Sequence, residues 1–248
     1  MMEPVHMTNP TSAVNPSPES IAALRGRGDD DAIVMVNLLK YAEPGGREHY
    51  ARYGAVAGAE IAARGGRALY SGSSVAGSDW DGVVLVYYPR RAAWLDMQDS
   101  PAYRAAIADR TAGLSARLLY AFTHGAGPLP VKPPPLEDVH RQSEDEIFVV
   151  NLLRYRGDEG RESFLRYGEV ASRLIHDLGG RVEMTLVADQ AMVSDNVWEH
   201  FVLVRYPSFD ALRSMLASED WQAADKAHRQ PGMAGTIAFP TRQYVARG

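Results

Sequence analysis

The stretch "VNLLKY" (residues 36–41) recurs as "VNLLRY" (residues 150–155), and this repetition is the strongest indication of the architecture. In both copies an Asn interrupts a run that otherwise has the composition of a buried β-strand. The similarity extends on both sides: residues 33–67 align with residues 147–181 without a gap, with 18 identities in 35 positions. Such internal similarity indicates a duplicated structural unit.

Each copy predicts the same order of elements. An apolar strand is followed by a helix that ends at Gly65-Gly66 or Gly179-Gly180, where glycine suits a left-handed helix stop. Two strands, a second helix and a last strand follow. The expected strands are 33–39, 67–75, 83–88 and 118–123 in the first copy and 147–153, 181–187, 201–206 and 236–239 in the second. The second helix of each copy is expected at 92–109 or 209–226. This order, βαββαβ, is that of a ferredoxin-like α+β unit.

Several predicted strands are apolar at consecutive positions, such as "VVLVYY" (residues 83–88). A sheet covered by helices on one side only would show alternation, so both faces of these strands should be buried. The sheet of the other copy is the simplest cover for the second face. We therefore expect two fused ferredoxin-like repeats that form an intramolecular pseudo-dimeric α+β barrel.

Composition divides the chain into four parts. A Pro- and Gly-rich stretch separates the copies and has the character of a linker. We predict an N-terminal arm at 1–30, the first repeat at 31–124, the linker at 125–145 and the second repeat at 146–244.

The bulk properties exclude several classes of protein. With 46% hydrophobic residues in 248, the chain can bury a core, and its net charge of -5 without a basic stripe argues against nucleic acid as a partner. Neither a targeting sequence nor an apolar run of membrane-spanning length is evident, so we expect a cytoplasmic protein with no membrane partner. Cysteine is absent, which removes disulfides and thiolate chemistry. The sequence leaves open whether the fused chain forms a homo-oligomer.

The motifs resemble those of a known family. "VNLLKY", "YARYG", "GGR", Trp80 before an apolar strand that ends in Tyr-Pro, and "DSPAYRAAIADR" are together similar to the domain-of-unknown-function family 1330. The second copy departs from this pattern where Glu219 and Trp221 replace Pro101 and Tyr103. The resemblance implies the dimeric α+β barrel superfamily. That superfamily includes cofactor-independent monooxygenases of aromatic polyketides, isomerases, haem-dependent members and non-catalytic ligand-binding domains.

Asn37 and Asn151 are the first candidate site residues. Strand parity directs both side chains to one of two buried faces, and a buried amide without partners costs about 1–3 kcal/mol. The structural explanation is a hydrogen bond to the helix hydroxyl of Tyr53 or Tyr167, or to strand backbone. The functional explanation is that the amides face the barrel lumen and orient a ligand.

Arg47 and Arg161 each follow a glycine closely at a predicted helix start, where a cation opposes the helix dipole. Ion pairs with Glu43 and Asp158 are one explanation, and capture of a substrate carboxylate is the other.

The strand "HFVLVRY" adds His200, which shares a face with Tyr206 and is a candidate general base next to an apolar pocket. Alternatively, His200 is exposed at the start of the strand. Tyr206 and its counterpart Tyr88 are candidate acid/base groups, and Trp80 and Trp198 are candidates for lining a site for a flat ligand. All four aromatic residues are also compatible with a core role.

No motif for a metal, a nucleotide or a nucleophilic serine is present, so we predict neither a metal site nor a cofactor. We expect the lumen to bind a small, partly aromatic molecule, and any catalysis to be proton transfer or cofactor-independent oxygenation. The alternatives are a non-catalytic ligand-binding or structural protein, and a haem-binding barrel with His200 or another His as axial ligand.

Overall fold

The computed structural model describes residues 13–75 and 78–244. A short helix, α1 (Pro18–Arg25), precedes two halves of the same architecture. The N-terminal half contains β1 (Ile33–Tyr41), α2 (Gly46–Ala62), β2 (Arg67–Ser74), β3 (Gly82–Tyr88), α3 (Arg91–Asp99), α4 (Pro101–Gly113) and β4 (Leu114–His124). Of the N-terminal arm predicted at 1–30, residues 1–12 lie outside the described residues.

The C-terminal half repeats this order. It contains β5 (Ile147–Tyr155), α5 (Gly157–Asp177), β6 (Arg181–Val193), β7 (His200–Tyr206), α6 (Phe209–Ala217), α7 (Glu219–Ala224), the π-helical segment η1 (Asp225–Arg229), α8 (Gln230–Gly232) and β8 (Met233–Gln243). Each half is therefore a βαββαβ unit, although the second helix of each is broken.

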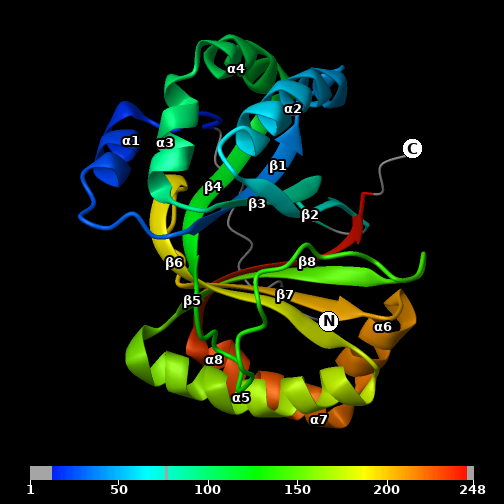
Figure 1. The fold of residues 1–248 in the computed structure, drawn as a ribbon. Coiled ribbons are helices and arrows are strands. Elements are labelled where there is room, and N and C mark those ends of the chain that lie inside the picture. The colour runs from blue at the N-terminus through cyan, green and yellow to red at the C-terminus, as the bar shows by residue number, and fades with distance from the viewer. Residues whose placement is uncertain (1–12, 76–77, 245–248) are drawn as a thin grey trace.

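The eight strands close into one barrel in the order β1-β3-β2-β8-β5-β7-β6-β4. All strand pairs are antiparallel, and the two halves join where β2 pairs with β8 and β4 pairs with β6. Figure 1 shows α2, α3 and α4 on one side of the barrel and α5, α6 and α7 on the opposite side. The predicted pseudo-dimeric α+β barrel is confirmed.

Side chains from both halves fill the interior of the barrel. Tyr70 and Phe148 face each other there with ring centroids 5.0 Å apart, and Trp80 and Trp198 are buried in the same core. Within the described residues this core occupies the space in which we expected a ligand. The expectation of a lumen site is therefore wrong: the apolar outer and inner faces of each strand serve two separate cores, one inside the barrel and one under the helices.

The second helix of each half is divided at a serine. Ser100 caps α4 by accepting a hydrogen bond from the Tyr103 amide, and Pro101 cannot continue the hydrogen bonding of α3 because it has no N–H. Ser218 caps α7 in the same way. The single helices that we predicted at 92–109 and 209–226 are therefore each interrupted.

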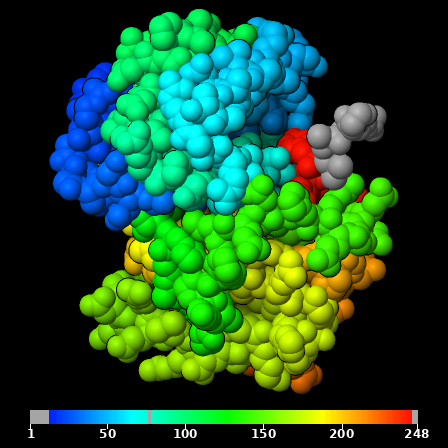
Figure 2. Space-filling model, viewed as in Figure 1, coloured from blue at the N-terminus to red at the C-terminus, as the bar shows by residue number. Residues whose placement is uncertain are grey.

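The stretch between the halves, residues 125–146, lies against both of them. Figure 2 shows this segment in green, running over the surface where the halves meet. The Val139 amide donates to the Leu69 carbonyl at 2.8 Å in the N-terminal half, while Leu129 packs in the core under α5. None of the helices among the described residues is long and apolar enough to span a membrane.

Candidate functional site

Two cavities lie between the helices and the outer face of the sheet, one in each half. The cavity of the N-terminal half has a volume of about 200 Å³ and that of the C-terminal half about 210 Å³. We call them the N-terminal and the C-terminal pocket. They occupy opposite outer faces of the same barrel, because the two helix layers do (Figure 1).

The two asparagines face these pockets. The side-chain nitrogen of Asn37 donates to the carbonyls of Met35 and Val84, each at 3.2 Å, and Asn151 donates to those of Val149 and Val202 at 3.1 and 3.3 Å. The expected partner in strand backbone is thus present in both halves. Asn37 and Asn151 also line the pockets, which lie on the helix side of the sheet and not in the lumen, so a role in ligand binding stays a prediction for these pockets.

Two buried arginines lie at the N-terminal pocket: Arg117 on β4 lines it, and Arg110 on α4 contacts the lining residues Tyr53 and Tyr103. Arg110 Nη1 donates to the hydroxyls of Tyr103 at 2.7 Å and Tyr53 at 3.4 Å. Arg117, which lines the pocket, donates through Nε to Asn37 Oδ1 at 3.2 Å and through Nη2 to the same oxygen. The remaining partners of both guanidinium groups are neutral oxygens of residues 14 and 15.

Among the described residues, this pair differs from the other buried arginines in having no counter-ion. Arg91 pairs with Asp29 and Asp189, and Arg205 pairs with Glu146 and Glu183. Arg110 and Arg117 are only 1% and 4% exposed, yet no carboxylate of the described residues forms an ion pair with either. A buried charge without a counter-ion is costly, and such an arrangement is typical of a site that receives an anion.

Tyr103 and Tyr53 form a hydroxyl pair with an O–O distance of 3.0 Å. Burial raises the pKa of Tyr103, but the charges of Arg110 and Arg117 lower it, and the net pKa lies below the ordinary value of 10.0. The pKa of Tyr53 is raised, chiefly by burial. Neighbouring groups whose pKa values diverge are the usual form of an acid/base pair. Tyr103 is therefore the group of the pair that loses its proton more readily.

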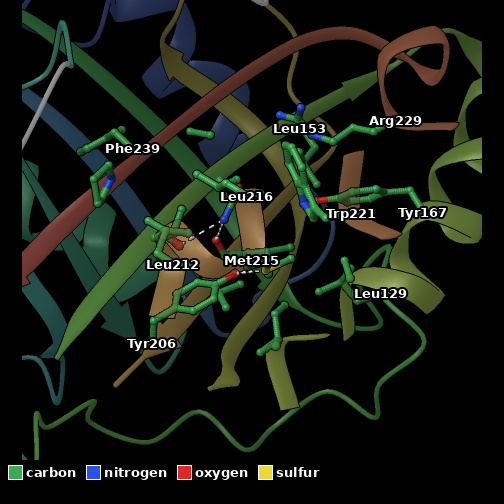
Figure 3. A pocket seen from close by; sticks show the side chains of 18 of the residues that line it. Leu129, Leu153, Tyr167, Tyr206, Leu212, Met215, Leu216, Trp221, Arg229 and Phe239 are labelled. Carbon is green, nitrogen blue, oxygen red and sulfur yellow. Dashed lines mark hydrogen bonds between the residues drawn. The ribbon is translucent and has the colours of Figure 1, made fainter. Parts of the chain in front are cut away.

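The C-terminal pocket is more apolar. Figure 3 shows Trp221 beside Tyr167, and Tyr206 beside Met215. Trp221 Nε1 donates to the Tyr167 hydroxyl at 3.1 Å, and the Tyr206 hydroxyl donates to Met215 Sδ at 2.9 Å. Trp221 replaces Tyr103, as the sequence repeat indicated, so this pocket has no counterpart of the tyrosine with the lowered pKa.

The charged groups of this pocket neutralise each other. Arg229 on η1 lines the pocket and pairs with Asp225 at 2.9 Å. Thr236 takes the place of Arg117, because it lies opposite Leu153 on the paired strand as Arg117 lies opposite Leu39. The C-terminal pocket thus has no unpaired cation among its described lining residues.

His200 is buried and lies outside the lining of both pockets. It is 3% exposed, it stacks at 5.6 Å from the ring of Tyr155, and neither ring nitrogen has a hydrogen-bond partner among the described residues. Burial, with a smaller contribution from the charge of Arg161, lowers the pKa of His200 to about 4. His200 is therefore neutral near pH 7, and the alternative of an exposed strand start is wrong.

The other predicted aromatic site residues lie in two places: the tyrosines line the pockets, and the tryptophans belong to the barrel core. Tyr88 lines the N-terminal pocket and Tyr206 the C-terminal pocket, together with the asparagines and with Tyr53 or Tyr167. Trp80 and Trp198 belong to the barrel core instead.

The two helix-start arginines lie outside the pockets. Arg47 and Arg161 are exposed, and Arg47 lies over the ring of Tyr41 at 4.4 Å. Within the described residues neither arginine forms the expected ion pair with Glu43 or Asp158. The stacking of Arg47 on an aromatic ring is what favours a cation at that position.

Tyr103, Arg110 and Arg117 were not among the site residues predicted from the sequence. The sequence contains features that could have identified them. Arg117 is a cation within the apolar run "ARLLYAF", and Tyr103 and Arg110 both belong to the motif "DSPAYRAAIADR". Seven residues separate Tyr103 from Arg110, which places them on one face of a helix.

The donor groups do not fit a histidine-ligated haem. No histidine lines either pocket, and His200 is enclosed by its own core beside Tyr155. Among the described residues, no group of three or more His, Asp or Glu side chains is placed to hold a metal ion.

Comparison with known proteins supports the fold. Residues 39–122 match the family described as a domain of unknown function, DUF1330. A protein of unknown function from Rhodopseudomonas palustris is 29% identical, with a TM-score of 0.42, and covers 50% of this chain with 100% of its own. No protein of curated function matches the chain significantly.

Two further solved structures cover most of the barrel. An anthrone oxidase-like protein is 12% identical, with coverage of 87% of this chain and 92% of that chain and a TM-score of 0.57. A variant of chlorite dismutase from Candidatus Nitrospira defluvii is 7% identical, with coverage of 90% and 94% and a TM-score of 0.51. At these identities the likeness shows the dimeric α+β barrel fold alone.

Proposed function

We propose that this protein binds a small aromatic or polyketide-like anion in the N-terminal pocket and catalyses a proton transfer there. The observation that carries the proposal is the pair of buried arginines, Arg110 and Arg117, without a carboxylate partner in the described residues. We also infer that the halves arose by duplication of one DUF1330 domain and that only the N-terminal half kept this charge.

The guanidinium groups have donors to spare for a ligand. A guanidinium carries five N–H donors, and the hydrogen bonds of Arg117 to Asn37 and Val14 use three of them. The described residues thus leave two N–H groups of Arg117, a lining residue, without an acceptor. A carboxylate or an enolate oxygen would accept both, and charged hydrogen bonds of this kind are the strong ones.

Tyr103 is the proposed acid/base group. With a lowered pKa it ionises more readily than an ordinary tyrosine, and its phenolate would accept a proton from an enolisable C–H of the bound compound. Arg117 would stabilise the negative charge left on the substrate oxygen. Tyr53 and Arg110, which both contact the Tyr103 hydroxyl, hold the phenolate in place.

This chemistry suits both an isomerase and a cofactor-independent oxygenase. In an isomerase the proton returns to another carbon. In an oxygenase the enolate reacts with O₂, as when an anthrone plus O₂ gives an anthraquinone plus water. A non-catalytic ligand-binding protein would use the same arginines without the proton transfer by Tyr103.

The binding half of the proposal is tested with 2-naphthoate and its neutral isostere 2-naphthamide, by isothermal titration calorimetry. We expect 2-naphthoate to bind more tightly and Arg117→Leu to weaken it roughly 10-fold to 100-fold, since a charged hydrogen bond contributes about 1.5–3 kcal/mol. Arg47→Leu, an exposed arginine outside the pocket, is the control and should change nothing. Equal affinity for acid and amide would overturn the proposal.

The catalytic half is tested by hydrogen–deuterium exchange at the acidic carbon of 2-tetralone in D₂O, followed by NMR. The wild-type protein should accelerate exchange, and Tyr103→Phe should abolish the acceleration while Tyr167→Phe, which removes a hydroxyl of the C-terminal pocket, keeps it. Retained 2-naphthoate binding without any exchange would support the non-catalytic alternative and reject the proton transfer.

A further inference from the structure

The C-terminal pocket differs from the N-terminal pocket in the state of its asparagine. In the N-terminal pocket, Arg117 donates two hydrogen bonds to Asn37 Oδ1. In the C-terminal pocket, Thr236 replaces the arginine, and Asn151 Oδ1 has no hydrogen-bond donor among the described residues. The orientation of the Asn151 amide is fixed, because its nitrogen donates to the carbonyls of Val149 and Val202. The oxygen is therefore an unused acceptor within the pocket lining.

A second polar group of this pocket has a hydrogen-bond donor without an acceptor among the described residues. The Tyr167 hydroxyl accepts a hydrogen bond from Trp221 Nε1, but the described residues offer no acceptor for its own proton. Burial raises the pKa of Tyr167, so the hydroxyl keeps that proton at neutral pH. The lining thus presents one acceptor, Asn151 Oδ1, and one donor, the Tyr167 O–H. A hydroxyl group on a ligand can satisfy both, because it donates and accepts at once.

The rest of the lining selects for a neutral, apolar molecule. Leu153, Phe164, Val202 and Met215 contribute apolar surface, and the only cation of the lining, Arg229, is paired with Asp225. An anion would find no unpaired positive charge here, and it would lose its hydration without compensation. The volume of about 210 Å³ is below the range of roughly 300–1,000 Å³ that is usual for drug-sized ligands, so the ligand is small.

We propose that the C-terminal pocket is a second binding site, specific for a small, neutral, apolar alcohol or phenol whose hydroxyl group donates to Asn151 Oδ1. The two halves then bind different classes of compound: an anion at Arg117 in the pocket of the N-terminal half, and a neutral hydroxyl compound in the C-terminal half. Because each pocket lies under its own helix layer, the two sites can be tested separately.

The test uses 2-naphthol, and 2-methoxynaphthalene as a probe that lacks the hydroxyl donor, with the full chain and isothermal titration calorimetry. We expect 2-naphthol to bind and Asn151→Leu to weaken it about fivefold to tenfold, the effect of losing one hydrogen bond. The affinity for 2-methoxynaphthalene should be unchanged or improved by the same substitution. Asn37→Leu is the matched control in the other half and should leave 2-naphthol binding unchanged.

A second variant tests the same site independently, in case Asn151→Leu does not fold. Ala238 lies opposite Asn151 on β8, lines the pocket and is exposed, so Ala238→Trp should block the entrance without disturbing the core. This variant should lose binding of 2-naphthol and retain that of 2-naphthoate. The proposal is overturned if 2-naphthol does not bind, if it binds equally to Asn151→Leu, or if Ala238→Trp binds it as well as the wild-type protein does.

Discussion

Replacing Asn37 and Arg117 together by leucine should make the protein more stable while removing its anion site. Arg117 is buried with three hydrogen bonds to neutral oxygens and no carboxylate partner among the described residues. If this charge serves to bind a ligand, its burial lowers the free energy of unfolding of the ligand-free protein. The double variant removes that charge and the amide that it contacts at the same time.

The magnitude follows from opposing contributions. Removal of an uncompensated buried ion relieves a penalty of several kcal/mol, and each new leucine buries apolar surface that contributes about 2 kcal/mol. The loss of the Arg117 and Asn37 hydrogen bonds opposes these gains by roughly 1 kcal/mol each for neutral groups and more for charged ones. Replacement of buried charges by apolar residues has a net effect of about 1–4 kcal/mol in favourable cases. We expect roughly 2 kcal/mol, which raises the Tm of a chain of this size by about 4–8 °C.

The assay is thermal and urea unfolding, with Arg91→Leu as the control. Arg91 is as deeply buried as Arg117 but is paired with Asp29 and Asp189, so its removal leaves these carboxylates with Arg27 as their cation and should destabilise the protein. The single variant Arg117→Leu should be close to neutral, because it leaves Asn37 Oδ1 without a donor. A double variant that is destabilised by more than about 1 kcal/mol would refute the reasoning, since Arg117 would then serve the fold.

Two further predictions concern the stability of the fold. The pKa of His200 is lowered from 6.5 to about 4, so the unfolded chain binds this proton more readily than the folded one. Stability from this group is complete above pH 6.5 and falls by about 3 kcal/mol between pH 6.5 and 4. His200→Phe should flatten this part of the pH profile of unfolding, and an unchanged profile would contradict the assignment. At the contact between α2 and α4, a Cβ added to Gly46 would lie 2.7 Å from the Gly113 carbonyl oxygen, whereas one added to Gly54 would meet nothing within 4 Å. In urea unfolding, Gly46→Ala should cost about 1–3 kcal/mol and Gly54→Ala should gain about 0.5–1 kcal/mol, and equal effects would show that the contact is not tight.

The architecture could be predicted from the sequence because several local signals agreed. The repeated "VNLL" strands, the glycines at the helix ends and the apolar runs without alternation pointed to two βαββαβ units with both sheet faces buried. Gly65 and Gly179 have positive φ values of 73° and 74°, as the helix stops required. The capping serines Ser100 and Ser218 were visible in the sequence but were passed over within apolar helical patterns.

The site was predicted less well, because strand parity cannot say which of two buried faces holds a cavity. Asn37 and Asn151 were identified correctly as polar residues on a buried face, but that face lies under the helices and not in the lumen. Tyr103 and Arg110 lie on one helix, but Arg117 comes from a strand and joins them only in three dimensions. The lack of a counter-ion for either arginine among the described residues is a property of the packing that spacing along the chain does not express.

A crystal structure of the protein with 2-naphthoate tests the central claim most directly. We predict that the carboxylate lies in the N-terminal pocket within hydrogen-bond distance of Arg117, with the Tyr103 hydroxyl facing the ring system. A carboxylate bound only in the C-terminal pocket, or only at the exposed Arg47, would contradict the account.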